Sequence, residues 1–335
     1  MYKTKGNSKP NLLRFILLLG VISFMLIGCD HPKKNYEPTP TPDTVTLGKT
    51  SHMSPDDINS LSTDENKMMT TIEKICVTPR PIGSNEEKAV YRNLKLELES
   101  YGYNTEVQEF PYILQTLKLK NTPFQTGNFF DFTIGEPEGT SQNLIAIKKP
   151  AAPDSQDIII VSAHYDTTIH STGAIDNASG VAVLMEIARQ IANYSIQREV
   201  RFILFSGEEN YLYGSRYYVS KLTDNERQHI IANLNLDCIG EEGTNEAILG
   251  TSNGRENEVS KLFANYDIEI QKGPMSDFFS FEKVGIPALT ITQYPTMDEN
   301  GKDLPDEISR INKTKLKVVA DTVAKVLLVQ LTTDQ

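Results

Sequence analysis

Apolar residues recur along the middle of the chain with two different spacings. Between residues 86 and 98, and again between 176 and 193, they return every three or four positions, and this period predicts amphipathic helices. Residues 105–110 instead alternate between apolar and polar, which is typical of an edge strand. Residues 157–162 form an almost unbroken β-branched run, and this pattern indicates a strand that is buried on both faces.

The alternation of strands and helices continues to the end of the chain. Apolar runs predict strands at 199–205, 230–236 and 287–292, and helical spacing predicts a closing helix at 315–331. Strands that alternate with helices of this length favour a mostly parallel sheet. We therefore expect an α/β fold in a single domain at residues 56–335, with a mostly parallel mixed sheet flanked by helices on both faces.

Residues 1–28 have the composition of a secretory signal peptide. Basic residues precede an apolar run at 15–27, which is too short for an ordinary membrane-spanning helix. The run ends in Leu26-Ile27-Gly28-Cys29, which resembles the bacterial lipobox. That resemblance implies cleavage before Cys29, attachment of lipid to its thiol, and export. An ordinary signal peptide, or a membrane anchor with a chance cysteine, is the alternative.

The charge that remains after removal of the signal peptide limits the partners of the protein. Removal takes away four of 33 basic residues and none of 44 acidic ones, which leaves a net charge of −15. Such a charge argues against nucleic acid and against a basic membrane-binding surface. Residues 29–55 lack apolar periodicity and contain a proline-rich stretch, so we predict a flexible tether there. The predicted membrane contact is the lipid on Cys29 of an exported lipoprotein, anchored to a bacterial membrane.

A histidine and two aspartates stand where predicted strands end. His164 and Asp166 leave the strand at 157–162 two residues apart. A histidine that binds zinc usually has its second ring nitrogen held by a carboxylate or a carbonyl, and Asp166 can supply that group. Asp237 closes the strand at 230–236, where a carboxylate is costly unless it is paired or metal-bound.

Two further acidic motifs have a similar placing. Asp176 opens a predicted helix in the motif Asp176-Asn177-Ala178-Ser179-Gly180, and an ordinary helix N-cap is the alternative interpretation there. Glu208 and Glu209 follow the strand at 199–205, and adjacent carboxylates repel unless a cation or a proton separates them. One of them suits a metal ligand and the other a general base, with a solvated loop as the alternative. Four motifs in this order favour one site, because strand ends gather ligands in such folds.

The series of motifs resembles that of the co-catalytic zinc aminopeptidases, which are related to the glutaminyl cyclases. Segments 79–84, 211–216 and 276–278 carry further signatures of that family. The resemblance implies a zinc cofactor and a peptide substrate with a free N-terminus. It also implies roles for six residues: the metal ligands His164, Asp176, Glu209 and Asp237, the general base Glu208, and Asp166, which orients His164.

Two positions depart from the family pattern. Phe278 stands where the family usually has a histidine, and Pro295 replaces the histidine that is the last ligand of the second zinc. Proline has no donor atom in its side chain. Asp298 is the candidate substitute ligand, and His170 is a weaker one. We therefore predict one tightly bound zinc ion and a weakened second site.

These observations predict a lipid-anchored, extracytoplasmic zinc-dependent exopeptidase, and within that class an aminopeptidase that hydrolyses N-terminal peptide bonds. A glutaminyl cyclase-like enzyme is one alternative, although its single zinc depends on the histidine that is missing here. A catalytically silent binding lipoprotein on the same fold is another, since the loss of a metal ligand is what such a protein would show.

Overall fold

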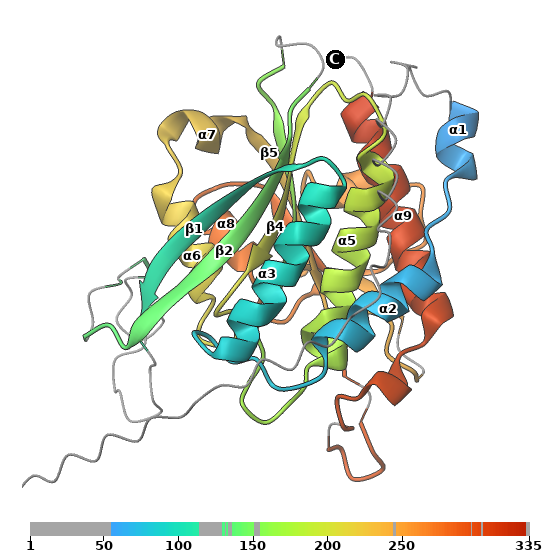
Figure 1. Ribbon diagram of the computed structural model, residues 1–335. Coiled ribbons are helices and arrows are strands. Elements are labelled where there is room, and N and C mark those ends of the chain that lie inside the picture. Colours follow the sequence, from blue (N-terminus) through green and yellow to red (C-terminus); the bar gives the residue numbers. More distant parts are fainter. Residues whose placement is uncertain are drawn as a thin grey trace, which may run out of the picture. The chain divides into compact units, whose positions relative to one another are not determined.

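The computed structural model describes residues 55–113, 129–130, 132, 136–150, 155–243, 246–295, 297–302 and 304–332. All of them belong to one compact unit, built on an eight-stranded sheet in the order β1-β2-β4-β3-β5-β8-β6-β7 (Figure 1). The strands are β1 (Asn104–Tyr112), β2 (Gly139–Lys148), β3 (Ile158–His164), β4 (Glu199–Phe205), β5 (Ile230–Asp237), β6 (Ile248–Thr251), β7 (Ile270–Lys272) and β8 (Ala288–Thr292).

The sheet is mixed, and its centre is parallel. Strands β4, β3, β5 and β8 run in one direction. β1 pairs with β2 in the antiparallel sense and lies at the edge of the sheet, as its alternating pattern predicted. The expected fold class is confirmed. Because the central strands are parallel, the residues that follow them gather at one end of the sheet.

Helices cover both faces of the sheet. On one face lie α2 (Glu65–Ile75), α3 (Asn85–Ser100), α5 (Gly180–Ile191) and α9 (Lys313–Thr332), and on the other lie α6 (Tyr213–Lys221) and α8 (Phe278–Glu282) (Figure 1). Successive side chains of a strand point to opposite faces. In β3, Ile159 and Val161 therefore pack into the first layer, and Ile158 and Ile160 into the second. Besides a turn before α5, the remaining described elements are α1 (Pro55–Ser60), α7 (Asp224–His229) and two short 3-10 helices, η2 (Ser260–Phe263) and η3 (Ile308–Arg310).

The helix predicted at 176–193 begins differently from the expectation. A π-helical turn, η1 (Ala174–Ser179), precedes α5, and Asp176 and Asn177 within it have non-helical backbone angles. No side-chain capping hydrogen bond forms at the start of either element. The N-cap interpretation of Asp176 is therefore wrong, and its carboxylate lies beside His164 instead.

None of the helices in the described part of the chain is both long and apolar enough to cross a membrane. The predicted signal peptide and Cys29 lie outside the described residues, as does the predicted tether up to residue 54. The boundaries at 28 and 55 therefore stay predictions from the sequence.

Candidate metal centre

The predicted site residues lie at the carboxyl end of the parallel strands. His164 is the last residue of β3, and Asp237 is the last residue of β5. Glu208 and Glu209 follow β4 after a turn at Gly207, whose φ of 76° favours glycine. β3 pairs with β4 on one side and with β5 on the other. The ends of these three neighbouring strands thus bring the side chains together.

His164, Asp176 and Asp237 form a compact group of metal-binding side chains. One donor atom from each lies within 4.8 Å of the other two. His164 Nε2 is 3.0 Å from Asp176 Oδ1 and 3.4 Å from Asp237 Oδ1. These distances are short, but neither contact has the geometry of a hydrogen bond. His164 Nε2 and Asp237 Oδ1 are therefore buried without a hydrogen-bond partner in the described structure. Unpaired polar atoms are costly when buried, so the group points to a bound cation.

The donor set fits a zinc ion. Zinc binds imidazole nitrogen and carboxylate oxygen, and three protein ligands with one open position are typical of catalytic zinc sites. Burial alone would lower the pKa of His164, but the charges of Asp237 and Glu208 raise it well above its ordinary value. The carboxylates therefore give the site a strong preference for positive charge.

The motif at 176–180 is tied to β5 by its asparagine. Asn177 Nδ2 donates to the carbonyl of Leu236 at 2.8 Å, and Asn177 Oδ1 accepts from the N–H of Gly180 at 2.9 Å. A Cβ at Gly180 would lie 2.3 Å from the Leu236 carbonyl oxygen, so the close approach requires glycine. These contacts fix Asp176 beside the end of β5, and they explain why the motif is more specific than an N-cap requires.

Asp166 contacts both the histidine and the turn of the glutamates. Its Oδ1 is 3.5 Å from His164 Nδ1 and accepts a hydrogen bond from the Glu208 N–H at 3.2 Å. Asp166 thus lies where an orienting carboxylate is expected. Burial, together with the charge of Asp237, raises the pKa of Glu208 well above its ordinary value. A raised pKa suits a carboxylate that acts as a general base near neutral pH.

The segment at 276–278 supports Asp237 from the side. Ser276 Oγ donates to Asp237 Oδ2 at 2.6 Å. Asp277 is fully buried, and burial raises its pKa to about 7. Phe278 packs into the second apolar layer. The residue that replaces the family histidine at 278 is therefore part of the core.

The second metal position is incomplete. Asp176, Glu209 and Pro295 line a cavity of about 250 Å³. Glu209 Oε1 accepts from the N–H of Thr168 at 3.2 Å, and burial raises the pKa of Glu209 to about 8. The other two carboxylates of the cavity have partners of their own: Glu241 pairs with Arg310 at 2.7 Å, and Asp306 accepts hydrogen bonds from Ser171 and Ile175. Asp176 and Glu209 without a third donor do not make the ligand set of a structural or catalytic zinc. The residues here do not fit a second zinc ion.

The two candidate substitute ligands lie elsewhere. Asp298 Oδ1 accepts from the N–H groups of Asn300 at 2.8 Å and Lys302 at 2.9 Å, which closes a turn. His170 is exposed in its loop. Neither belongs to the described residues that line the cavity of Pro295. Within the described residues, neither belongs to the group of metal-binding side chains.

Arg80 was missed as a site residue, although its segment carries a family signature. Its buried guanidinium donates to the carbonyls of Tyr165 at 2.5 Å, Thr172 at 2.5 Å and Gly173 at 3.2 Å. These carbonyls lie in the segment between the end of β3 and the start of η1, so Arg80 holds that segment in place. The position of this arginine between two prolines, Pro79 and Pro81, was the feature of the sequence that could have indicated its role.

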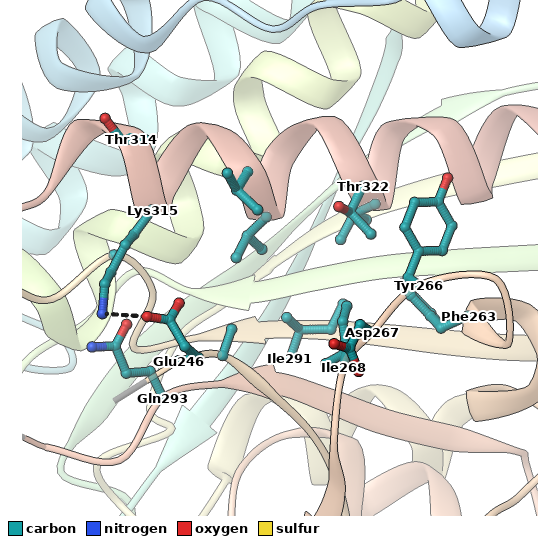
Figure 2. A pocket seen from close by; sticks show the side chains of 15 residues that line it. Glu246, Phe263, Tyr266, Asp267, Ile268, Ile291, Gln293, Thr314, Lys315 and Thr322 are labelled. Atoms are coloured by element: carbon teal, nitrogen blue, oxygen red, sulfur yellow. Dashed lines mark ion pairs between the residues drawn. The ribbon is translucent and has the colours of Figure 1, made fainter. Parts of the chain in front are cut away.

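A larger cavity, of about 420 Å³, lies between α9 and β8 (Figure 2). Its lining includes the apolar side chains of Val319, Val323 and Ile291. An ion pair of 3.1 Å between Glu246 and Lys315 lies at one end. Within the described residues, the group of metal-binding side chains lies outside this cavity. Chemistry, rather than size, therefore identifies the candidate site.

Comparisons with known proteins agree with this geometry. Residues 143–327 match peptidase family M28. Aminopeptidase YwaD of Bacillus subtilis is 35% identical over 197 residues, which are 55% of this chain and 43% of YwaD. The chain thus spans less than half the length of this curated relative.

Solved structures show the same fold. An aminopeptidase from Aneurinibacillus sp. strain AM-1 has a TM-score of 0.68 at 25% identity, over 81% of this chain and 94% of the other. Glutaminyl cyclase of Porphyromonas gingivalis has a TM-score of 0.64 at 22% identity, over 80% of this chain and 99% of the other. The family match covers more than half of the chain and includes every predicted metal ligand. The resemblance inferred from the motifs is confirmed, and the chain belongs to peptidase family M28.

Proposed function

We propose that this chain is a zinc-dependent aminopeptidase, which removes residues from the N-termini of peptides. The observation that carries the proposal is the compact group of His164, Asp176 and Asp237, with unpaired buried donor atoms beside Glu208. Membership of a peptidase family supports peptide hydrolysis as the reaction class. The name of the relative YwaD, an aminopeptidase, supports attack at the N-terminus.

The residues of the site suit this chemistry. His164, Asp176 and Asp237 would hold the zinc ion. When bound, zinc would polarise the scissile carbonyl and lower the pKa of water. Glu208 would accept the proton of the attacking water and return it to the leaving amine. Asp166 would keep the imidazole ring oriented, because it faces His164 Nδ1.

The cavity lined by Asp176, Glu209 and Pro295 favours a substrate with a positive charge. Its described lining contains two further acidic residues, Glu241 and Asp306, and no basic one, although Arg310 pairs with Glu241 from outside the lining. An excess of carboxylates attracts an ammonium group. A free peptide N-terminus carries such a group, so the cavity supports an exopeptidase over an endopeptidase.

We also propose that the protein is an exported lipoprotein, held at a bacterial membrane through Cys29. The support is the lipobox-like sequence Leu26-Ile27-Gly28-Cys29 after a short apolar run. Cys29→Ser should move the protein from the membrane fraction to the soluble exported fraction. Unchanged membrane retention of that variant would contradict lipid attachment.

One experiment tests the proposed activity. Zinc per chain is measured first, and hydrolysis of a panel of aminoacyl-anilides is then measured before and after chelation. We expect about one zinc per chain, and activity that chelation abolishes. A protein that binds zinc but hydrolyses no anilide would favour the silent binding lipoprotein. Cyclisation of N-terminal glutamine in place of hydrolysis would favour the cyclase.

A further inference from the structure

Glu87 is a fully buried carboxylate in the first turn of α3, outside the metal centre. The Gly83 N–H donates to its Oε2 at 2.7 Å, and the Ser141 hydroxyl donates to its Oε1 at 2.5 Å. The Ser206 hydroxyl also donates to Oε1, and the Tyr165 hydroxyl is 3.4 Å from the same atom. One side chain thus accepts from the loop before α3, from β2 and from the residue after β4. It also lies near the Tyr165 hydroxyl after β3, which donates to the Gln142 carbonyl at 2.7 Å.

Packing alone does not account for a carboxylate at this place. Burial raises the pKa of Glu87 to about 7, hydrogen bonds from Ser141 and Ser206 lower it in part, and the charge of Asp166 raises it. A buried carboxylate is costly, and an apolar side chain would fill the same space without that cost. Both of its oxygens accept hydrogen bonds, as those of an ionised carboxylate do. A carboxylate at this buried position therefore indicates a role that depends on the hydrogen bonds it accepts.

The donors to Glu87 adjoin the residues of the proposed mechanism. Ser206 stands two residues before Glu208, the general base. Tyr165 directly follows His164, and its N–H donates to the last carbonyl of β4 at 2.9 Å. A shift of Ser206 or Tyr165 would therefore move a residue of the catalytic site.

We infer that Glu87 is a positioning residue, which fixes the turn of Glu208 through the hydroxyl of Ser206; this inference rests on the proposed aminopeptidase function. Ser141 Oγ lies 2.7 Å from Ser206 Oγ, so β2 and α3 hold that hydroxyl together. Displacement of a catalytic group by about 1 Å costs on the order of 100-fold in rate. The expected effect is on kcat, because the base acts in the chemical step and Glu87 does not face the substrate cavity.

Glu87→Gln is the first test, with Glu86→Gln as the matched control on the exposed side of the same helix. Glutamine keeps the shape of the side chain but replaces one acceptor oxygen with a donor, so it cannot accept all of the native bonds. At pH 8.5, kcat for an aminoacyl-anilide should fall by about 10- to 100-fold, with KM within about threefold and zinc content unchanged. Glu86→Gln should match the wild type. A kcat of Glu87→Gln within twofold of the wild type would overturn the inference.

A double-mutant cycle tests the route through Ser206. Ser206→Ala removes the hydroxyl that connects Glu87 to the turn, so it should lower kcat by a similar factor. The double variant should be no slower than the slower single variant, because both changes remove one connection. Effects that multiply would show that the two residues act independently, and they would overturn the proposed route.

Amide hydrogen exchange tests the inference without relying on hydrolysis. In the zinc-loaded protein, Glu87→Gln should speed exchange at the N–H of Glu208, which donates to Asp166, and Glu86→Gln should not. Unchanged exchange in Glu87→Gln would overturn the positioning role. Faster exchange in a protein whose wild type hydrolyses nothing would support the positioning role and contradict the proposed function alone.

Discussion

The two metal positions of this site share Asp176 and differ in almost everything else. The first position draws on His164 and Asp237, buried residues that end the adjacent strands β3 and β5. The second has Glu209 as a ligand and Pro295 where a ligand would be needed. These two residues are partly or fully exposed and lie in the connections after β4 and β8. Loops tolerate substitution more readily than the strands of a core do. A ligand can therefore be lost from the second position while the first stays intact.

The strongest test of this difference between the two metal positions is to remove the histidine of the first position. His164→Ala leaves two of the three proposed ligands, so zinc content should fall from about one per chain to near zero, and hydrolysis with it. Metal analysis and an anilide assay measure the two effects. The control His170→Ala should retain both, because His170 is exposed outside the site. Zinc retained in His164→Ala would mean that the first position is not the metal site.

The adjacent glutamates separate the base from the weakened second position. Glu208→Gln keeps its shape but cannot accept a proton, so kcat should fall by about 10²- to 10⁴-fold while zinc stays bound. Glu209→Gln should lower kcat less, because its position already lacks a ligand. Steady-state kinetics with metal analysis compare the two variants. Equal losses would show that the second position contributes to catalysis as strongly as the base.

Substitution of Asp166 tests how strongly zinc binding at the first position depends on the carboxylate that orients His164. Removal of the carboxylate that orients a zinc-bound histidine typically weakens metal affinity by about 10- to 100-fold. Asp166→Asn should do so here, as measured by competition with a chromophoric chelator. The glutamine variant of Glu209 serves as the comparison, and its tight zinc should keep the affinity of the wild type. An unchanged affinity in Asp166→Asn would remove Asp166 from the orienting role.

The smallest expected effect comes from rebuilding the second position. Pro295→His restores an imidazole beside Asp176 and Glu209, so zinc content should rise from about one towards two per chain. Asp298→Asn is the control, and it should leave zinc content unchanged because Asp298 closes a turn of its own. Two tightly bound zinc ions in the wild type would contradict the contrast between the positions.

The sequence predicted the features that depend on local burial. A strand buried on both faces is largely apolar, and β3, β4 and β5 are each rich in apolar residues, although Arg201 interrupts β4 and Asn233 and Asn235 interrupt β5. A polar residue at the end of such a strand, or just beyond it, is easily recognised, and His164, Glu208 and Asp237 were found in this way. The parallel order of these strands then placed the three side chains at one end of the sheet.

Features that depend on distant partners could not be read from the sequence. Strand β2 was missed because its first half is polar, although Ser141 and Asn143 are buried by hydrogen bonds to residues far along the chain. Glu87 looks like an ordinary acidic residue of a first helical turn, where such residues are favourable in solvent. Its burial follows from the contact with Ser206, 119 residues away. The backbone of Asp176 likewise depends on the tie between Asn177 and β5.

The hydrogen bonds by which Arg80 holds the loop before η1, called the clamp below, bear on where the functional domain of this protein begins. The residues that match the family start at 143, yet the guanidinium that holds the loop before η1 lies more than sixty residues earlier. A fragment cut at the start of the match would keep every proposed zinc ligand and would lose the clamp. These hydrogen bonds also join residues 85 or more positions apart, and such contacts carry a loop-closure cost before they form. We expect a nascent chain to acquire its metal centre only after the segment around Arg80 has docked, which would keep the peptidase inert until its fold is complete.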